Sequence, residues 1–193
     1  MPDATPPSAL LPARDRILHT AHRLFYRHGI RATGIDRVIA ESQVAKKTFY
    51  RHFASKNVLI LDYLEYRHQR WMSWFNDALQ RHGGGVTALV PTLAEWLQDA
   101  DFRGCAFINS VGELGDDLPE VKARCRRHKQ AMTAVIAGLL APCEPPRPTA
   151  QAIALAVDGA IVRAQCEPDP AGVLQALERI LTALRPTPPS KPE

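Results

Sequence analysis

The sequence predicts an all-α fold of about nine helices, and three observations support this prediction. Apolar residues recur at helical spacing along most of the chain. No segment of useful length alternates apolar and polar residues as a half-buried strand does. Glycine and proline separate the periodic segments, and a hydrophobic content of 46% is sufficient for a core. We expect a flexible tail over residues 1–12, a domain over 13–56, a second domain over 57–185 and a tail over 186–193.

The first two helices of the 13–56 domain are set by an apolar face and by residues at their ends. Ile17 and Leu24 share one face of the first helix, and His22 lies on the opposite face, which we expect to be solvated. Gly29 is expected to end this helix in a left-handed conformation. Thr33 is expected to begin the second helix, because its hydroxyl can accept a hydrogen bond from a free backbone N–H of the first turn.

The third helix of this domain, over residues 46–53, combines an aromatic face with a cationic one. Phe49 and Phe53 are expected to anchor it inward, whereas Lys46, Lys47 and Arg51 supply positive charge for phosphates and base edges. Residues 1–56 hold 10 Lys+Arg against 4 Asp+Glu, and the remainder of the chain holds 14 against 16. A basic first third joined to a near-neutral remainder is typical of a nucleic-acid-binding domain attached to a second domain.

Residues 35–56 resemble the DNA-binding signature of the TetR family of one-component transcriptional regulators. The resemblance rests on the run from Thr48 to Phe53, followed by Ser55 and Lys56, directly after a helix-turn pair. It implies a helix-turn-helix domain and a homodimer on palindromic double-stranded operator DNA. It also implies a repressor that is released by a small-molecule effector bound in a C-terminal helical domain. The predicted DNA contacts are Thr33, Lys46, Lys47, Thr48, Tyr50, Arg51, His52 and Lys56.

Two positions depart from the family pattern. The turn before the third helix has Gln43 where glycine is usual, which costs about 1 kcal/mol if the residue must adopt a positive φ. The usual serine at the start of the third helix is Ala45, so a capping hydroxyl worth about 1 kcal/mol is missing. Both changes lower local stability without removing a DNA-contacting side chain.

Beyond Lys56 the periodicity predicts helices of unequal length. The first two are expected over residues 56–82, ended by three glycines, and over 86–100, kinked or restarted near Pro91. The next run over 104–115 and from about 117 to 140, the latter capped by Asp117 and Glu120. A loop over 142–148 precedes the last two helices, over 150–165 and 171–185.

The last two helices are expected to form the dimer contact. Each carries an apolar stripe, and such a pair suits a four-helix contact between two copies. Leu155, Ala156 and Val162 make the opposite face of the first one apolar as well, so it must be covered on more than one side. The alternative is that both stripes close the chain's own core. The predicted interface residues are Ile153, Ala154, Val157, Ile161, Ala164, Val173, Leu177, Ile180, Leu181 and Leu184.

Most of the large aromatic side chains fall in the helices that the family resemblance places around an effector. An aromatic-lined cleft with a few polar groups binds small apolar or aromatic molecules. The alternative is that these aromatics are ordinary core residues. The predicted effector pocket consists of Trp71, Trp74, Phe75, Trp96, Phe102, Cys105, Phe107 and Asn109.

Cys105 and Asn109 belong to a segment that resembles a Gly-Cys-x-x-x-Asn helix entry in one subset of the family. A thiol at a helix N-terminus beside Arg103 has its thiolate favoured, which makes Cys105 a candidate sensor of oxidants or electrophiles. The alternative is a small buried thiol that packs against Phe107. Asn109 either orients a ligand or satisfies a loop carbonyl.

Catalytic, cofactor and metal sites are not indicated. The sequence has no defensible Ser-His-Asp arrangement, phosphate-binding glycine loop or paired carboxylates. His19 and His22 are expected on a solvated face, and His68, His82 and His128 are scattered along the chain.

The remaining composition predicts a cytoplasmic protein. Cys105, Cys125, Cys143 and Cys166 form neither a zinc pattern nor a disulfide framework, so we expect reduced thiols. No secretory signal and no apolar stretch of about 20 residues is present. Three other classes remain open: an architectural DNA-binding protein without effector, a small helical enzyme, and a module that binds a partner helix.

Overall fold

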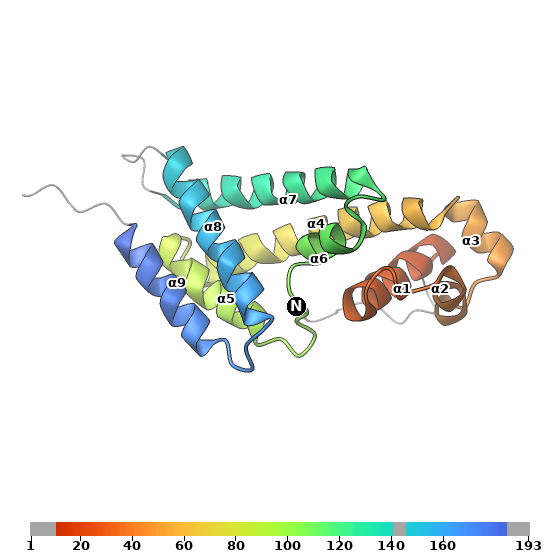
Figure 1. Cartoon of the computed structure of the whole chain (residues 1–193), viewed down its shortest axis with the longest axis horizontal. Helices are drawn as coiled ribbons and strands as arrows, with labels where there is room; N and C mark the ends of the chain where they lie inside the picture. Colours follow the sequence, from red (N-terminus) through yellow and green to blue (C-terminus); the bar gives the residue numbers. More distant parts are fainter. Residues whose placement is uncertain (1–10, 141–145, 185–193) are drawn as a thin grey trace, which may run out of the picture. The chain divides into compact units, whose positions relative to one another are not determined.

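The computed structural model describes residues 11–140 and 146–184. Over these residues the chain forms nine α-helices and one 3-10 helix, with no described residue in a β-strand, so the predicted all-α fold is confirmed (Figure 1). In chain order the elements are α1 (Ala13–His28), α2 (Ile35–Ser42), α3 (Lys46–His52), α4 (Lys56–Arg81), η2 (Val86–Ala88), α5 (Leu89–Leu97), α6 (Ala106–Leu114), α7 (Pro119–Gly138), α8 (Pro146–Ala164) and α9 (Ala171–Ala183).

The chain divides into two compact units. The first comprises the chain up to Ser73 together with Asp99–His128, and therefore contains α1, α2, α3, α6 and the first parts of α4 and α7. The second comprises Trp74–Gln98 and the chain from Lys129 onward. The predicted boundary at residue 56 falls inside the first unit, and the predicted domains stay a sequence-based division. The tail over 186–193, most of the tail over 1–12 and Cys143 lie outside the described residues.

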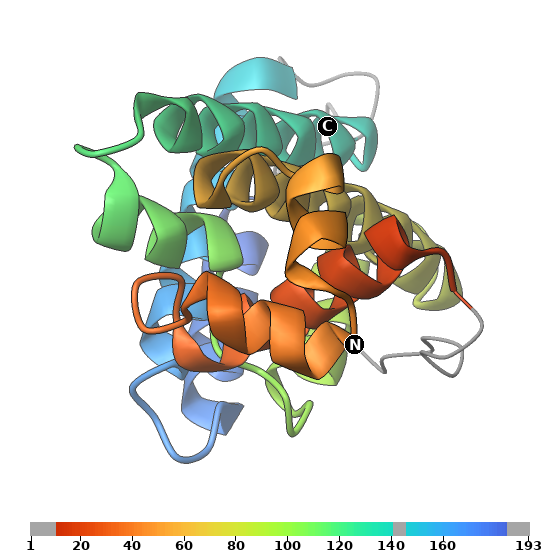
Figure 2. The same cartoon turned by 90° about the vertical axis from the view of Figure 1, so that its right-hand side faces the viewer.

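In the first unit, α1 packs against α2 and α3, and these three helices correspond to the predicted helix-turn-helix domain (Figure 2). The apolar face of α1 lies inside, with Ile17 and Leu24 fully buried. Val38 of α2 and Phe49 and Phe53 around α3 are equally inaccessible. Burial of these side chains supplies most of the stability of so short a helical group, because helices of seven or eight residues are not stable alone.

The turn after α1 is built by Gly29 and Thr33. The Gly29 N–H donates to the Phe25 carbonyl at 3.0 Å, so α1 ends at the predicted glycine. Its φ of +88° is positive as expected, but its ψ of 154° lies outside the left-handed helical region. Thr33 does not cap α2, whose N-cap is Gly34 without a side-chain hydrogen bond. The Thr33 side chain is fully buried, and its hydroxyl donates to the Gly29 carbonyl at 2.7 Å. The predicted cap is therefore wrong, because this hydroxyl stabilises the turn between α1 and α2 instead.

The turn between α2 and α3 has the two features expected from its unusual residues. Gln43 adopts a left-handed backbone (φ 54°, ψ 43°) and is the only non-glycine with positive φ among the described residues. Ala45 stands at the N-cap of α3 with an extended backbone and provides no capping side chain.

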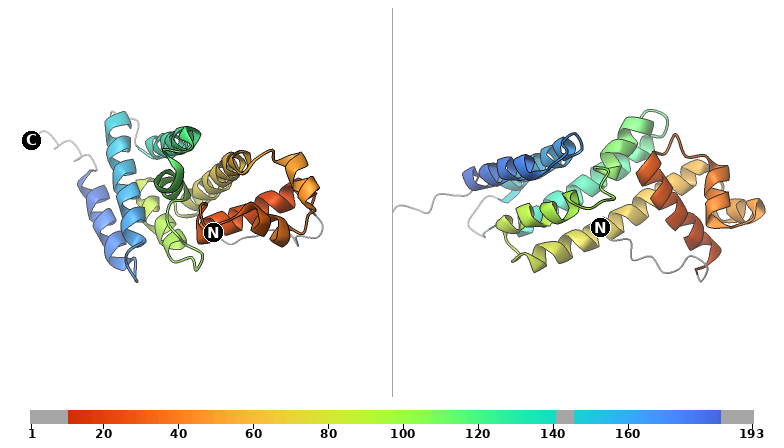
Figure 3. Two further views of the ribbon diagram at one scale, coloured as in Figure 1. Left: turned by 45° about the vertical axis from the view of Figure 1, so that its right-hand side comes forward. Right: turned by 90° about the horizontal axis from the view of Figure 1, so that it is seen from below.

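In the second unit, two helices begin at positions that proline determines. The segment predicted over 86–100 forms the short η2 and then α5, and Pro91 lies in the first turn of α5, where its missing N–H costs nothing. Helix α8 begins at Pro146, inside the predicted loop over 142–148, since proline is favoured at the first helical position. Helices α8 and α9 run side by side and pack on each other (Figure 3).

Candidate nucleic-acid interface and associated sites

The exposed face of α3 carries the predicted DNA contacts. Phe49 and Phe53, with ring centres 6.0 Å apart, hold its other face in the core. Lys46, Lys47 and Arg51 are exposed, as is 45% of Tyr50, so the cationic and aromatic groups point outward together. Thr48 and His52 are half-buried beside them.

The charges on this face are free to meet phosphates. Lys46 lies 3.6 Å from Asp36, an exposed pair of small energetic value. Lys47 and Arg51 form no ion pair with any residue that the structure describes. Glu41 of α2 is held by Arg37 at 2.8 Å and by Arg23 at 2.7 Å, and the hydrogen bond from Arg37 lowers the pKa of its carboxyl. The charge of Glu41 is thus balanced by arginines of α1 and α2.

Two of the predicted DNA contacts have structural roles within the first unit. Thr33 has no accessible surface, so it is corrected from a DNA contact to a buried turn residue. Lys56 is half-buried, and its ammonium donates to the Ile30 carbonyl at 2.7 Å, which ties the start of α4 to the turn after α1. Burial lowers the pKa of Lys56. Its contact with DNA stays a prediction.

Helix α6 is attached to α1 and its following turn at both ends. At the start of α6, the Tyr26 hydroxyl donates to the Gly104 carbonyl at 3.0 Å and accepts from the Arg103 N–H at 3.0 Å. At the end, Arg31 donates its backbone N–H to the Glu113 carboxylate at 2.8 Å and its Nε to the Glu113 carbonyl at 2.6 Å. The Arg31 guanidinium also pairs with Asp117, which was predicted as a helix cap.

A buried polar group joins α1 to α4. His22 and Arg67 are 8% and 5% exposed, and Arg67 Nη1 lies 3.2 Å from His22 Nε2. The guanidinium also lies 3.9 Å from the centre of the Tyr26 ring. The prediction of a solvated His22 is wrong. The apolar residues of α1 indicate only one buried face, whereas α4 covers the face that carries His22 as well.

The predicted effector residues of the first unit surround a histidine that the sequence did not single out. The His128 ring of α7 stacks on Phe107 at 3.8 Å and meets Trp71 edge-on at 5.1 Å. Its Nδ1 lies 3.1 Å from Nδ1 of His68 on α4, and burial lowers the pKa of His68. The prediction that His68 and His128 are scattered is therefore wrong in space, since residues 60 positions apart meet when α4 and α7 pack.

The other predicted effector residues are divided between the units. Asn109 donates from Nδ2 to the Arg103 carbonyl at 2.9 Å, Cys105 is 3% exposed at the N-cap of α6, and Phe102 is half-buried. In the second unit, the Trp74 and Trp96 rings lie 6.2 Å apart and Phe75 is fully buried. A single effector pocket built from all of them stays a prediction.

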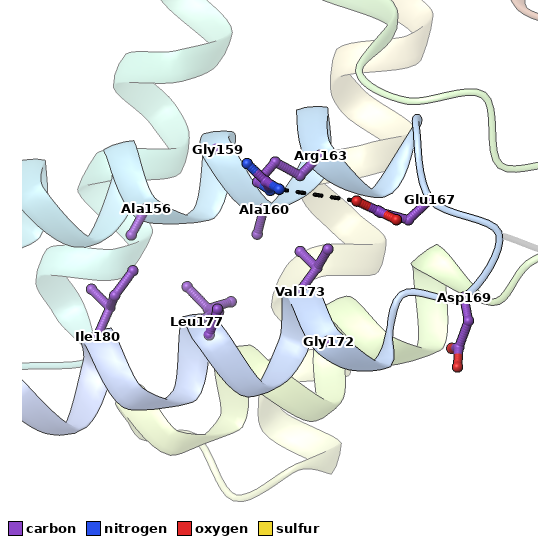
Figure 4. Close-up of a pocket in the computed structure, with 11 residues that line it drawn as sticks. Ala156, Gly159, Ala160, Arg163, Glu167, Asp169, Gly172, Val173, Leu177 and Ile180 are labelled. Atoms are coloured by element: carbon purple, nitrogen blue, oxygen red, sulfur yellow. Dashed lines mark ion pairs between the residues drawn. The ribbon is translucent and has the colours of Figure 1, made fainter.

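The α8–α9 pair carries an open groove of about 620 Å³ on its outer face (Figure 4). Its floor is formed by Ala156, Gly159, Ala160, Gly172 and Ala176, residues small enough for a second helix to approach closely. An Arg163–Glu167 ion pair at 4.0 Å lies at one end. The other lining residues are Asp169, Val173, Leu177 and Ile180.

Most residues of the predicted dimer interface lie inside the second unit instead. Leu184 is half-buried, and eight of them are at most 8% exposed: Ile153, Ala154, Val157, Ile161, Ala164, Val173, Leu177 and Leu181. These stripes close the unit's own core, which was the alternative considered, because α9 packs on α5 and α8. Of the predicted set, only Val173, Leu177 and Ile180 line the groove, and only Ile180 is exposed, at 44%. The opposite face is the exposed apolar one, with Leu155 at 75% and Val162 at 42%.

No group of three metal-ligating side chains occurs among the residues that the structure describes. Over the same residues, no helix is long and apolar enough to cross a membrane. Of the cysteines in the described ranges, Cys105, Cys125 and Cys166 are not part of a disulfide.

Known proteins resemble the chain in sequence and fold. Residues 17–63 match the family described as bacterial regulatory proteins, tetR family. The uncharacterised HTH-type transcriptional regulator YerO of Bacillus subtilis is 42% identical over 53 residues, which are 28% of this chain and only 18% of YerO. The multidrug binding protein EbrR, solved in complex with malachite green, is 20% identical with a TM-score of 0.69 over 90% of this chain and 98% of EbrR, a likeness of fold alone.

Another solved structure matches most of the chain at higher identity than EbrR does. SCO4454, a TetR-family transcriptional regulator from Streptomyces coelicolor, is 32% identical with a TM-score of 0.80, over 89% of this chain and 93% of SCO4454. These relatives regulate transcription and are not enzymes, so the prediction of no catalytic function is confirmed. Because SCO4454 is 32% identical over 93% of its own length and residues 17–63 match the family model, the chain belongs to the TetR family of transcriptional regulators.

Proposed function

We propose that the chain is a homodimeric, ligand-released repressor that binds a palindromic operator through α3. The observation that carries this proposal is the outward face of α3, where Lys47 and Arg51 have no ion-pair partner among the described residues while Phe49 anchors the helix. Phosphate contacts from such cations position a helix, and side chains beside them read the base edges. A repressor of this kind works on chromosomal DNA, and therefore in the cytoplasm.

Dimerisation through the α8–α9 groove is supported by its shape and composition. Ile180 lines the groove and is 44% exposed, and Leu155 and Val162 of α8 add exposed apolar surface outside its lining. The small residues of the floor permit close packing of a second helix pair, and a two-fold axis would bring the same groove from each copy together. Two α3 helices held one DNA turn apart, about 34–36 Å, then fit successive major grooves.

Release by a ligand is supported by the attachment of α6 to α1. A ligand that binds more tightly to the conformation with α6 in one of two placements shifts the population of chains toward that conformation. Because Tyr26 and Arg31 fix both ends of α6 to α1 and its turn, a change in α6 must alter these contacts. The complex of EbrR with malachite green indicates that this fold can hold an aromatic dye, and we propose an aromatic effector for the predicted pocket.

The alternative of a thiol sensor at Cys105 receives less support. A sensor thiol must be reached by an oxidant, whereas Cys105 is 3% exposed between Gly104 and the first turn of α6. An architectural DNA-binding protein without effector has no need of contacts that couple α6 to α1, so the α1–α6 contacts favour the ligand-responsive regulator.

The experiment that tests the proposal is selection of binding sites from a pool of random-sequence duplexes by the purified chain. The selected sequences are expected to contain an inverted repeat whose half-sites lie about one helical turn apart. Enrichment of an unrepeated site, or no enrichment at all, would contradict a palindromic operator.

A further inference from the structure

We propose that a second site, between α1, α4 and α6, binds a small carboxylate. The site is a cavity of about 210 Å³ in the first unit. It is separate from the groove on α8 and α9, and it shares only Asn109 with the predicted effector pocket. A cavity of about 150 Å³ holds benzene, so this one suits a molecule of benzene size with one polar substituent.

The cavity is lined by a phenol hydroxyl that no other described residue binds. Tyr63 is 1% exposed and lines the cavity, yet its hydroxyl forms no hydrogen bond with any described residue. The hydroxyl of a buried tyrosine usually has a hydrogen-bond partner, so this donor is available to a ligand in the cavity. A carboxylate oxygen inside the cavity would accept from this hydroxyl.

The charges around the cavity favour an anion. Arg27 and Arg103 line it, and Arg27 forms no ion pair or hydrogen bond with another described residue. Behind the wall, the Arg67 guanidinium lies 3.9 Å from the centre of the Tyr26 ring. The one carboxylate that lines the cavity, Glu113, already accepts the Arg31 N–H at 2.8 Å. Positive charge therefore exceeds negative charge at the site.

The aromatic side chains of the cavity wall indicate that the carboxylate is attached to an aromatic ring. Phe25, Tyr26 and Tyr63 line the cavity, and Phe25 and Tyr63 meet edge-to-face at 5.4 Å. Rings in such arrangements accept a further aromatic ring readily. An aromatic carboxylate would thus place its ring against these side chains and its charge toward Tyr63 and Arg27, joining α1 to α4.

Calorimetric titration of the full chain with benzoate, and with benzamide as a neutral molecule of the same shape, tests this site. Benzoate is expected to bind with one site per chain, and benzamide at least tenfold more weakly, because a hydrogen bond to a charged group is worth more than one to a neutral group. Equal affinities, or no heat from benzoate at millimolar concentration, would overturn the proposal.

Two variants locate the binding. Tyr63→Phe removes only the unsatisfied hydroxyl, so the thermal stability of the chain should be unchanged or higher while benzoate affinity falls roughly tenfold. Arg27→Gln should weaken benzoate to a similar degree. The matched controls are Tyr66→Phe on α4 and Arg23→Gln on α1, neither of which lines the cavity, and both should bind as the wild type does. If neither Tyr63→Phe nor Arg27→Gln weakens benzoate binding, benzoate binds elsewhere in the chain and the assignment of this cavity as its site is wrong.

Discussion

Gln43 holds a left-handed backbone that glycine adopts without steric penalty, in the turn that sets the angle between α2 and α3. For a residue with a Cβ this conformation costs roughly 1–2 kcal/mol. Replacement by glycine removes this strain but costs about 0.5–1 kcal/mol, because glycine loses more conformational freedom on folding. Gln43→Gly should therefore raise the free energy of unfolding by about 0.5–1 kcal/mol in a urea titration. Gln43→Ala retains the Cβ and serves as the control, with no gain expected. A loss of stability in the glycine variant would show that the Gln43 side chain contributes more than its backbone costs.

His68 should make stability depend on pH. Burial lowers its pKa below the ordinary 6.5, so as pH falls the unfolded chain takes up a proton before the folded chain does. The stability is present above pH 6.5 and is lost as pH falls through the window below it. His68→Asn keeps a hydrogen-bonding amide near the position of Nδ1 and cannot titrate. Urea midpoints measured between pH 7.5 and about 5 should fall less steeply for this variant, and identical slopes would rule out His68 as a source of the dependence.

At the residue scale, the sequence predicted what depends on neighbours along the chain and missed what depends on neighbours in space. Gln43 and Ala45 behave as expected, and Gly29 ends α1 with the expected positive φ, because these backbone conformations follow from the turn chemistry. His22 and His68 could not be placed, because their partners Arg67 and His128 lie on other helices, 45 and 60 positions away.

Among the elements, α6 is attached at its start by a single side chain of another helix. The Tyr26 hydroxyl of α1 serves the Gly104 carbonyl and the Arg103 N–H at once. Tyr26→Phe leaves both groups without this partner, and Gly104 is buried, so a loss of about 1–3 kcal/mol of unfolding free energy is expected. The control Tyr66→Phe loses only a hydrogen bond from Arg70 at the partly exposed side of α4 and should cost less. Equal losses in the two variants would mean that Tyr26 does not hold the start of α6.

Helix α3 lacks a capping side chain, and one substitution supplies it. Ala45 has the extended backbone (φ −68°, ψ 146°) that an N-cap residue adopts. Ala45→Ser should stabilise the chain by about 1 kcal/mol, since its hydroxyl can accept from a free N–H of the first turn. Ala40→Ser, on the exposed face of α2, offers no cap and should not stabilise. Thermal melting of both variants beside the wild type separates the cap from a general effect of serine.

At the scale of elements, periodicity located the helices but could not decide which apolar face meets what. Helix α8 is apolar on two faces, and the stripe through Ile153 and Val157 proved to be the core face rather than the outer one. The face with Leu155 remains exposed. Only the packing of α9 on α5 and α8, which joins segments distant in sequence, distinguishes the two.

For the whole molecule, dimerisation through the α8–α9 groove can be tested at its floor. A Cβ at Gly159 meets nothing within 4 Å, so Gly159→Arg should fold normally while filling the groove with a long charged side chain. Sedimentation should find the wild type as a dimer and this variant as single chains, and the variant should bind the selected operator more weakly. Gly138→Arg on α7 is the control, because a Cβ there is equally unobstructed and lies outside the groove. A Gly159→Arg chain that still sediments as a dimer would place the interface on another surface.

The entry of α3 into a DNA groove is tested most directly by anisotropy titrations of the selected duplex at several salt concentrations. Lys47→Ala and Arg51→Ala should each weaken binding several-fold to roughly tenfold, and each should lower the slope of log affinity against log salt by about 1, as loss of one phosphate contact requires. Arg126→Ala, an exposed arginine of α7, should bind as the wild type does. If the two α3 variants bind as tightly as Arg126→Ala and show the same salt slope, α3 does not read this DNA.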